Sequence, residues 1–101
     1  MINKSVLDAA YKLAKGTYTA TSHAEAKDKL QSEFPNISWD EIAEAYLKGA
    51  ELVEKCYEIG EAARQNNIPD AQAIEMLKER FPGFSNQTYH DALTLGWFLS
   101  R

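Results

Sequence analysis

Two histidines, one cysteine and a row of glutamates are the residues of this chain that could take part in catalysis or metal binding. His23 and His90 lie far apart in the sequence. Neither has a cysteine or carboxylate at the spacing of a zinc motif such as H-E-x-x-H or C-x-x-C. We therefore expect no metal site and no cofactor.

The glutamates recur at helical spacing, at Glu51, Glu54, Glu58 and Glu61. Basic residues are interleaved with them, so that Lys48 follows Glu44, and Lys55 follows Glu51, after four residues. Opposite charges at this spacing stabilise the exposed side of a helix by about 0.2–0.5 kcal/mol per pair. We interpret the row as a solvated, ion-paired side of a helix rather than as a catalytic carboxylate site.

The sequence has no glycine-rich phosphate loop, no nucleophile elbow and no interpretable Ser/His/Asp order. Its one cysteine, Cys56, falls on the apolar side of a predicted helix, where a small buried side chain is the simplest interpretation. A single cysteine forms no internal disulfide, which favours a reducing, cytoplasmic location. We expect a cytoplasmic protein that is not an enzyme and has no small-molecule substrate.

The composition narrows the choice of partners. The 101 residues are 45% hydrophobic and 26% charged, which is sufficient for the core of a single domain over residues 1–101. The net charge of −4 weighs against nucleic acid, because proteins that bind phosphates usually present a basic face. No apolar run approaches the roughly 20 residues of a membrane-spanning helix, so we expect no membrane partner.

The element that must position these residues is a long central helix over residues 38–64. Ser38 and Glu41 form a capping box, which marks where the helix starts. Flanking apolar residues such as Tyr57 widen its apolar stripe, so we expect neighbours on more than one side of the helix. The stripe itself recurs in steps of three and four, at Trp39, Ile42, Tyr46, Gly49, Val53, Cys56, Gly60 and Ala63.

Four shorter helices are predicted over about residues 5–15, 22–34, 69–80 and 85–99. Ser22 and Glu25 are expected to cap the second of them. Pro35, Pro69 and Pro82 stand at the breaks, because proline cannot continue a helix. No stretch alternates strictly between apolar and polar residues. The sequence therefore predicts an all-α protein, a bundle of five helices.

The two halves of the chain, about residues 5–50 and 51–99, form an internal repeat. The segment AEAKDKLQSEFPNIS, which begins at Ala24, aligns without gaps with AQAIEMLKERFPGFS, which begins at Ala71. The bundle thus consists of two helix–FP turn–helix units that share the central helix. In both units the Phe-Pro turn follows an inner leucine by four residues, which predicts that Phe34 and Phe81 are buried at equivalent places in the core.

Three glycines fall inside the predicted helices. Gly49 and Gly96 are aligned by the repeat, and Gly60 lies on the apolar stripe of the central helix. Upstream, AAYKLA from Ala9 resembles KCYEIG from Lys55. A glycine inside a helix costs up to about 1 kcal/mol relative to alanine, so we predict that other helices cross closely at these glycines.

The segments LQSEFPNIS and LKERFPGFS resemble the start of CUE-type ubiquitin-binding domains, which place a Met-Phe-Pro turn between their first two helices. The resemblance covers roughly half of each repeat and implies ubiquitin-type binding through the FP turns. Glu33 and Arg80 stand where the methionine is expected, and no third helix ending in two leucines follows either turn.

The segment FSNQTYHDAL resembles the start of the recognition helix in helix-turn-helix DNA-binding proteins. This resemblance implies a regulator that reads bases with Asn86, Gln87 and His90 on helix 85–99. Arg80 and Arg101 would then contact phosphates. A proline lies in the turn, however, and the equivalent helix of the first repeat begins with acidic residues that would repel DNA.

A small acidic helical protein of this kind most simply acts by binding another protein or a second copy of itself. The candidate surface is the apolar run from Leu95 to Leu99, whose consecutive side chains point around the whole helix. Trp97 and Phe98 cannot both join the side shared by these two leucines, so we expect one of them at an interface, such as that of a homodimer. The sequence leaves open the alternative that the last helix is buried all round.

Overall fold

The computed structural model describes residues 3–16 and 23–99, and all regular secondary structure in this part of the chain is helical. The elements are α1 (Lys4–Gly16), α2 (His23–Glu33), α3 (Trp39–Gln65), α4 (Asp70–Arg80) and α5 (Asn86–Leu99). The predicted all-α bundle of five helices is confirmed, whereas the predicted cap at Ser22 lies outside the described residues. Within the described ranges, no helix combines the length and the apolar character that crossing a bilayer requires.

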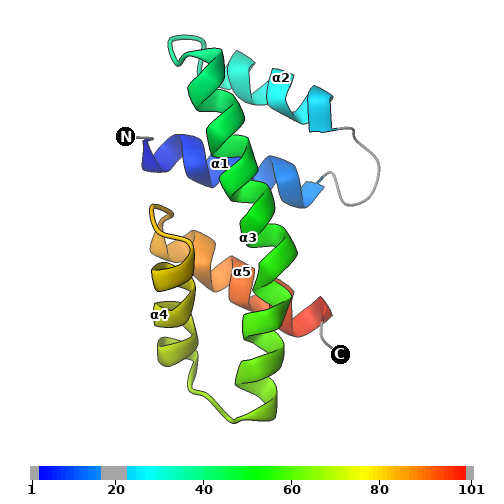
Figure 1. Ribbon diagram of the computed structural model, residues 1–101, viewed down its shortest axis with the longest axis vertical. Helices are drawn as coiled ribbons and strands as arrows, with labels where there is room; N and C mark the ends of the chain where they lie inside the picture. Colours follow the sequence, from blue (N-terminus) through cyan, green and yellow to red (C-terminus); the bar gives the residue numbers. More distant parts are fainter. Residues whose placement is uncertain (1–2, 17–22, 100–101) are drawn as a thin grey trace.

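The long helix α3 is the rod to which the other four helices attach (Figure 1). Along its length α1 and α5 cross it one below the other, and their contacts with it are the most extensive in the molecule. In the same view α2 and α4 lie on opposite sides of α3. The described part measures 43 × 29 × 16 Å, so the arrangement is flat.

Local signals define both ends of α3. The Ser38 hydroxyl accepts a hydrogen bond from the Glu41 amide at 3.3 Å, which confirms the predicted N-cap. At the other end the Asn66 amide donates to the Ala62 carbonyl, and Asn67 follows with a φ of 52°. Asparagine is one of the few residues that tolerate this left-handed conformation, so the chain can turn there toward α4.

Two close crossings hold α1 and α5 against α3. A Cβ atom added to Gly49 would lie 2.7 Å from the carbonyl carbon of Ala10 and from the amide nitrogen of Tyr11. A Cβ atom added to Gly60 would lie 2.6 Å from the carbonyl carbon of Gly96. Neither position has room for a side chain against the neighbouring backbone, so the predicted close crossings at glycine are confirmed.

The glycines of the two crossings, Gly49 in α3 and Gly96 in α5, are paired by the alignment of the internal repeat. Gly49 lies against the backbone of Ala10 and Tyr11, and Gly96 lies against the backbone of Cys56 and Tyr57. The upstream alignment pairs AAYKLA with KCYEIG, and so matches the two segments that the glycines face. The same kind of contact therefore fixes α1 on the first half of α3 and α5 on the second half.

Each Phe-Pro turn is held by one polar side chain. The Gln31 amide group donates to the Phe34 carbonyl at 3.1 Å, and the Tyr89 hydroxyl donates to the Phe81 carbonyl at 2.6 Å. Both phenylalanine rings are half-buried at the edge of the core rather than buried, which corrects the prediction. Each phenylalanine follows the last residue of its helix, so its ring lies where the helix ends rather than between helices. Over Phe81 the Arg80 guanidinium lies 5.6 Å from the ring centre.

Candidate functional site

Polar side chains join α1 to α5 at the start of α5. Asp8 accepts hydrogen bonds from the Ser85 amide at 3.0 Å and from the Thr88 hydroxyl at 2.8 Å. Ser85 also accepts a hydrogen bond from the Thr88 amide at 3.2 Å, as an N-cap serine does. The first turn of α5 is thus capped from within and by a carboxylate of a neighbouring helix.

A second polar contact joins the same two helices. Asp91 accepts from the Tyr11 hydroxyl at 2.6 Å and from the Lys15 ammonium at 2.9 Å. Burial alone would raise the pKa of Asp91, but the hydrogen bonds from Tyr11 and Lys15 and the nearby lysine charges outweigh it and lower the pKa. Burial and the Asp91 carboxylate raise the pKa of Tyr11 well above its ordinary range. The pair consists of an ionised carboxylate and a protonated phenol at neutral pH, which suits a structural contact better than proton transfer.

Cys56 is buried in α3, close to this contact. Its thiol donates to the Val53 carbonyl at 3.3 Å, and burial raises the pKa of the thiol to about 11. The thiolate is the reactive form of cysteine, so Cys56 is a weak nucleophile in this environment. The side chain fills space in the core, in agreement with the interpretation of the sequence.

The two histidines belong to different helices. His23, at the start of α2, shares a hydrogen bond with the Tyr46 hydroxyl, and its ring meets the Tyr46 ring edge-on at 5.6 Å between centroids. His90 is exposed on α5. Across residues 3–16 and 23–99, no three His, Cys, Asp or Glu side chains are grouped so that they could hold a metal ion.

The residues predicted to contact nucleic acid are only partly brought together. Asn86, Gln87 and His90 are all exposed near the start of α5. Arg80, at the end of α4, pairs with the Glu58 carboxylate of α3 at 3.1 Å. Arg101 lies outside the described residues. One helix therefore presents three polar side chains, while the predicted phosphate ligand Arg80 is engaged by a carboxylate.

The two candidate interface residues, Trp97 and Phe98, differ in burial. Trp97 is half-buried and packs against the core, and its backbone lies against Gly60. Phe98 is 67% exposed. Of the two, Phe98 is therefore the one that leaves most of its side chain at the surface.

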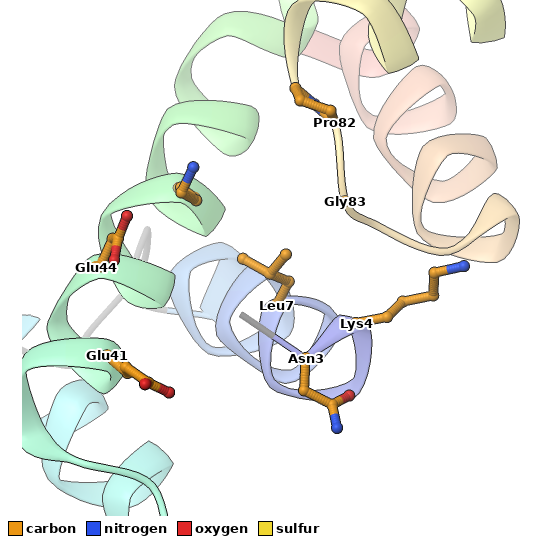
Figure 2. A pocket seen from close by; sticks show the side chains of 8 residues that line it. Asn3, Lys4, Leu7, Glu41, Glu44, Pro82 and Gly83 are labelled. Atoms are coloured by element: carbon orange, nitrogen blue, oxygen red, sulfur yellow. The ribbon is translucent and has the colours of Figure 1, made fainter. Parts of the chain in front are cut away.

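A groove of about 890 Å³ lies at one end of α1 (Figure 2). Lys4 extends from α1 toward the turn that contains Gly83, and Glu41 and Glu44 line the groove from α3. Lys48 adds a second positive charge, so both signs are present in equal number. These charged side chains are exposed, and no buried polar group converges on the groove, so its chemistry favours no particular ligand.

A different apolar surface stands out on α3. Four large apolar side chains are exposed in the described part of the chain, and three of them belong to α3, namely Trp39 at 48%, Leu47 at 60% and Tyr57 at 43%. Ala43 and Ala50 lie between them at helical spacing, which places all five on one side of the helix. We call these five residues the outer face of α3.

The outer face corrects the assignment of Trp39 to the inner stripe and of Tyr57 to a covered flank. The close crossings of α1 and α5 lie on the side of α3 that carries Gly49 and Gly60, so none of the described helices covers Trp39, Leu47 and Tyr57 on the other side. The steps of three and four between apolar residues were visible in the sequence, but they do not tell a covered stripe from an uncovered one.

A groove of about 580 Å³ lies beside the outer face, between α2 and α3. Ala43, Tyr46, Leu47 and Ala50 line it with mostly apolar surface. Polar side chains border it, His23 and Lys27 from α2 and Glu44 and Glu54 from α3.

The carboxylates beside the outer face are not neutralised by neighbouring cations. The predicted ion pairs Glu44–Lys48 and Glu51–Lys55 do not form, and Glu54 takes part in none of the ion pairs among the described residues. An exposed pair of this kind gains little energy, which explains why side chains at suitable spacing remain apart. The outer face therefore combines exposed apolar side chains with unpaired negative charge.

Comparison of the chain with protein-family models, with curated proteins and with solved structures found no match.

Proposed function

We propose that this protein acts without catalysis, in the cytoplasm, by binding another protein through the outer face of α3. The single observation that supports the proposal is the alignment of Trp39, Leu47 and Tyr57 on one helix side, each exposed by more than two-fifths. Exposed apolar side chains are common singly, whereas a continuous row of them usually marks an interaction surface. Aromatic residues are also the type most enriched among the residues that dominate binding energy.

The polar groups described above support the absence of catalysis in this proposal. Burial raises the pKa values of Tyr11 and Cys56 and keeps both protonated and unreactive, and the pKa of Asp91 is lowered by its contacts with Tyr11 and Lys15, which makes it a weaker base. An enzyme shifts such groups toward the form that reacts near neutral pH. Tyr11 and Asp91 join α1 to α5, and Cys56 fills space in the core of α3.

The DNA-binding regulator remains a second candidate, favoured by the exposure of Asn86, Gln87 and His90 on α5. The acidic net charge and the engagement of Arg80 by Glu58 speak for protein as the partner instead. Retardation of labelled duplex DNA at moderate salt distinguishes the two. Ubiquitin-type binding through the FP turns has less support, because Phe34 and Phe81 are half-buried.

A photo-crosslinking amino acid at position 47 tests the main proposal in cells that express the protein. We expect adducts with another protein from position 47 and none from position 72, an exposed residue of α4 used as the matched control. An adduct of twice the mass of the chain would identify a second copy as the partner. The same adducts from both positions, or none from position 47, would contradict binding at the outer face.

A further inference from the structure

We infer that the partner presents a basic amphipathic helix, which lies along the outer face of α3 and fills the groove between α2 and α3. This inference rests on the proposed function and adds the chemical class of the partner. Three properties of the surface support it, namely its shape, its length and its charge.

The shape fits a helix. Leu47 projects from the surface, and Ala43 and Ala50 stand one turn to either side of it with little side chain of their own. Bulky side chains of a second helix can enter these two low positions and pack around Leu47, as apolar anchors spaced by three and four residues do in helix-in-groove complexes. The groove beside them widens this apolar surface toward Tyr46.

The length also fits. From Trp39 to Tyr57 the outer face extends along α3 for about 27 Å at 1.5 Å per residue. A partner helix of about five turns would span it. Its apolar side chains would cover Trp39 at one end, Leu47 in the middle and Tyr57 at the other end.

The charge determines the class of partner. Glu44, Glu51 and Glu54 are exposed along one flank of the outer face, and none of them is in an ion pair with another described residue. A partner that covers this flank must neutralise these carboxylates, because burying an unpaired charge is costly. Lysine or arginine side chains along one flank of the partner helix would do so.

A second copy of this chain does not meet the same requirement. In a symmetric dimer the same surface of both copies forms the interface, so the outer face would meet itself. Both copies would bring Glu51 and Glu54 into the interface without matching cations, and an excess of like charge in an interface disfavours the complex.

Peptide binding to the full chain tests the inference. The probe is a fluorescent peptide of about eighteen residues, with leucine at helical spacing on one side and lysine elsewhere. A glutamate counterpart has the same apolar side, and a scrambled peptide has the same composition as the probe without an apolar side. We expect the lysine peptide to bind at least about tenfold more tightly than either of the others.

Single substitutions locate the binding. Leu47→Ser and Glu54→Lys should each weaken binding of the lysine peptide about tenfold. Glu79→Lys on α4 is the matched control, because it changes the net charge equally at an exposed carboxylate away from the outer face, and should leave binding nearly unchanged. All three positions are exposed, and circular dichroism verifies that the helices are retained.

The outcomes separate this inference from the proposed function. If the scrambled peptide binds as well as the probe, or if Glu79→Lys acts like Glu54→Lys, the attraction is nonspecific and the inference is wrong. If the glutamate peptide binds equally well and depends on Leu47, the outer face binds a helix but the basic class is wrong. If no peptide binds while position 47 still gives crosslinks, the proposed function holds and this inference fails.

Discussion

Gly49 of α3 and Ala10 of α1 are so close that the two backbones touch where the helices cross. A Cβ atom at position 49 would lie 2.7 Å from the Ala10 carbonyl carbon, a separation that would force one helix to move. The equivalent crossing of α5 is formed by Gly96 and the backbone of Cys56. These two contacts set the position of α3 relative to α1 and α5, and so determine which of its sides remains uncovered.

Gly49→Ala should therefore destabilise the protein. Overpacking of this kind costs about 1–3 kcal/mol, and we expect the upper part of that range because backbone atoms occupy the space. This overpacking cost outweighs the gain of up to about 1 kcal/mol that replacing glycine by alanine brings to a helix. Gly16→Ala is the control, since no atom lies within 4 Å of its added Cβ. Chemical denaturation measures both variants, and an equal rise in stability for the two would show that the crossing is looser than described.

The contact between Tyr11 and Asp91 should make the stability of the protein depend on pH in the acid range. The pKa of Asp91 is lowered in the folded protein. Ionised Asp91 therefore stabilises the fold fully at pH values above the pKa of an unfolded aspartate, about 3.9. The contribution is lost as the pH falls through the lower, folded pKa. Asp91→Asn should reduce the loss of stability between about pH 5 and pH 2, whereas Asp28→Asn on the exposed side of α2 should not.

Tyr11→Phe tests the same contact from the other side. It removes the hydroxyl that donates to Asp91 at 2.6 Å and leaves the ring in place. Because the Asp91 side chain is 40% exposed, we expect a cost of about 1 kcal/mol rather than the larger value of a buried charged contact. Urea denaturation at neutral pH measures it, and an unchanged midpoint would mean that water replaces the phenol without loss.

Phenylalanines 81 and 84 should differ in their contribution to stability. Phe84 is buried, so Phe84→Ala should cost about 3–5 kcal/mol. Phe81 is half-buried, and Phe81→Ala should cost roughly half as much, about 2 kcal/mol. The sequence predicted that Phe81 is buried, which would give Phe81→Ala the full cost of about 3–5 kcal/mol. Thermal unfolding measures both variants, and an equal effect at the two positions would restore that prediction.

Trp97 and Phe98 should respond differently to a polar substitution. Trp97→Ser removes a ring that packs against the core and should lower the melting temperature sharply. Phe98→Ser changes an exposed ring and should leave the melting temperature within a few degrees of the wild type. Sedimentation of the same samples reports self-association. If Phe98→Ser converts a dimer to a monomer, the C-terminal end of α5 is the interface that the sequence suggested.

The sequence predicted the local features of the fold because their signals are local. Ser38 caps α3, which begins at Trp39, and the prolines stand at the helix breaks. The glycine crossings were also predictable, since a costly residue repeated at aligned positions of a helix needs a neighbouring backbone to explain it.

The contacts between distant segments could not be predicted. Asp8 and Ser85, or Tyr11 and Asp91, are about eighty residues apart in sequence, and nothing in either segment identifies the other. The outer face escaped prediction for a related reason. The apolar spacing of Trp39 and Tyr57 is the same whether or not a helix covers them, and only the placement of α1 and α5 shows that none does.

Amide chemical shifts of the isotope-labelled full chain, measured by NMR during titration with the lysine–leucine peptide, test the central claim most directly. We expect the largest changes at Ala43, Leu47, Ala50 and Tyr57, with the amides of Asn86 and Gln87 at the start of α5 unchanged. Changes centred on the start of α5, or spread evenly over every acidic surface, would contradict binding at the outer face of α3.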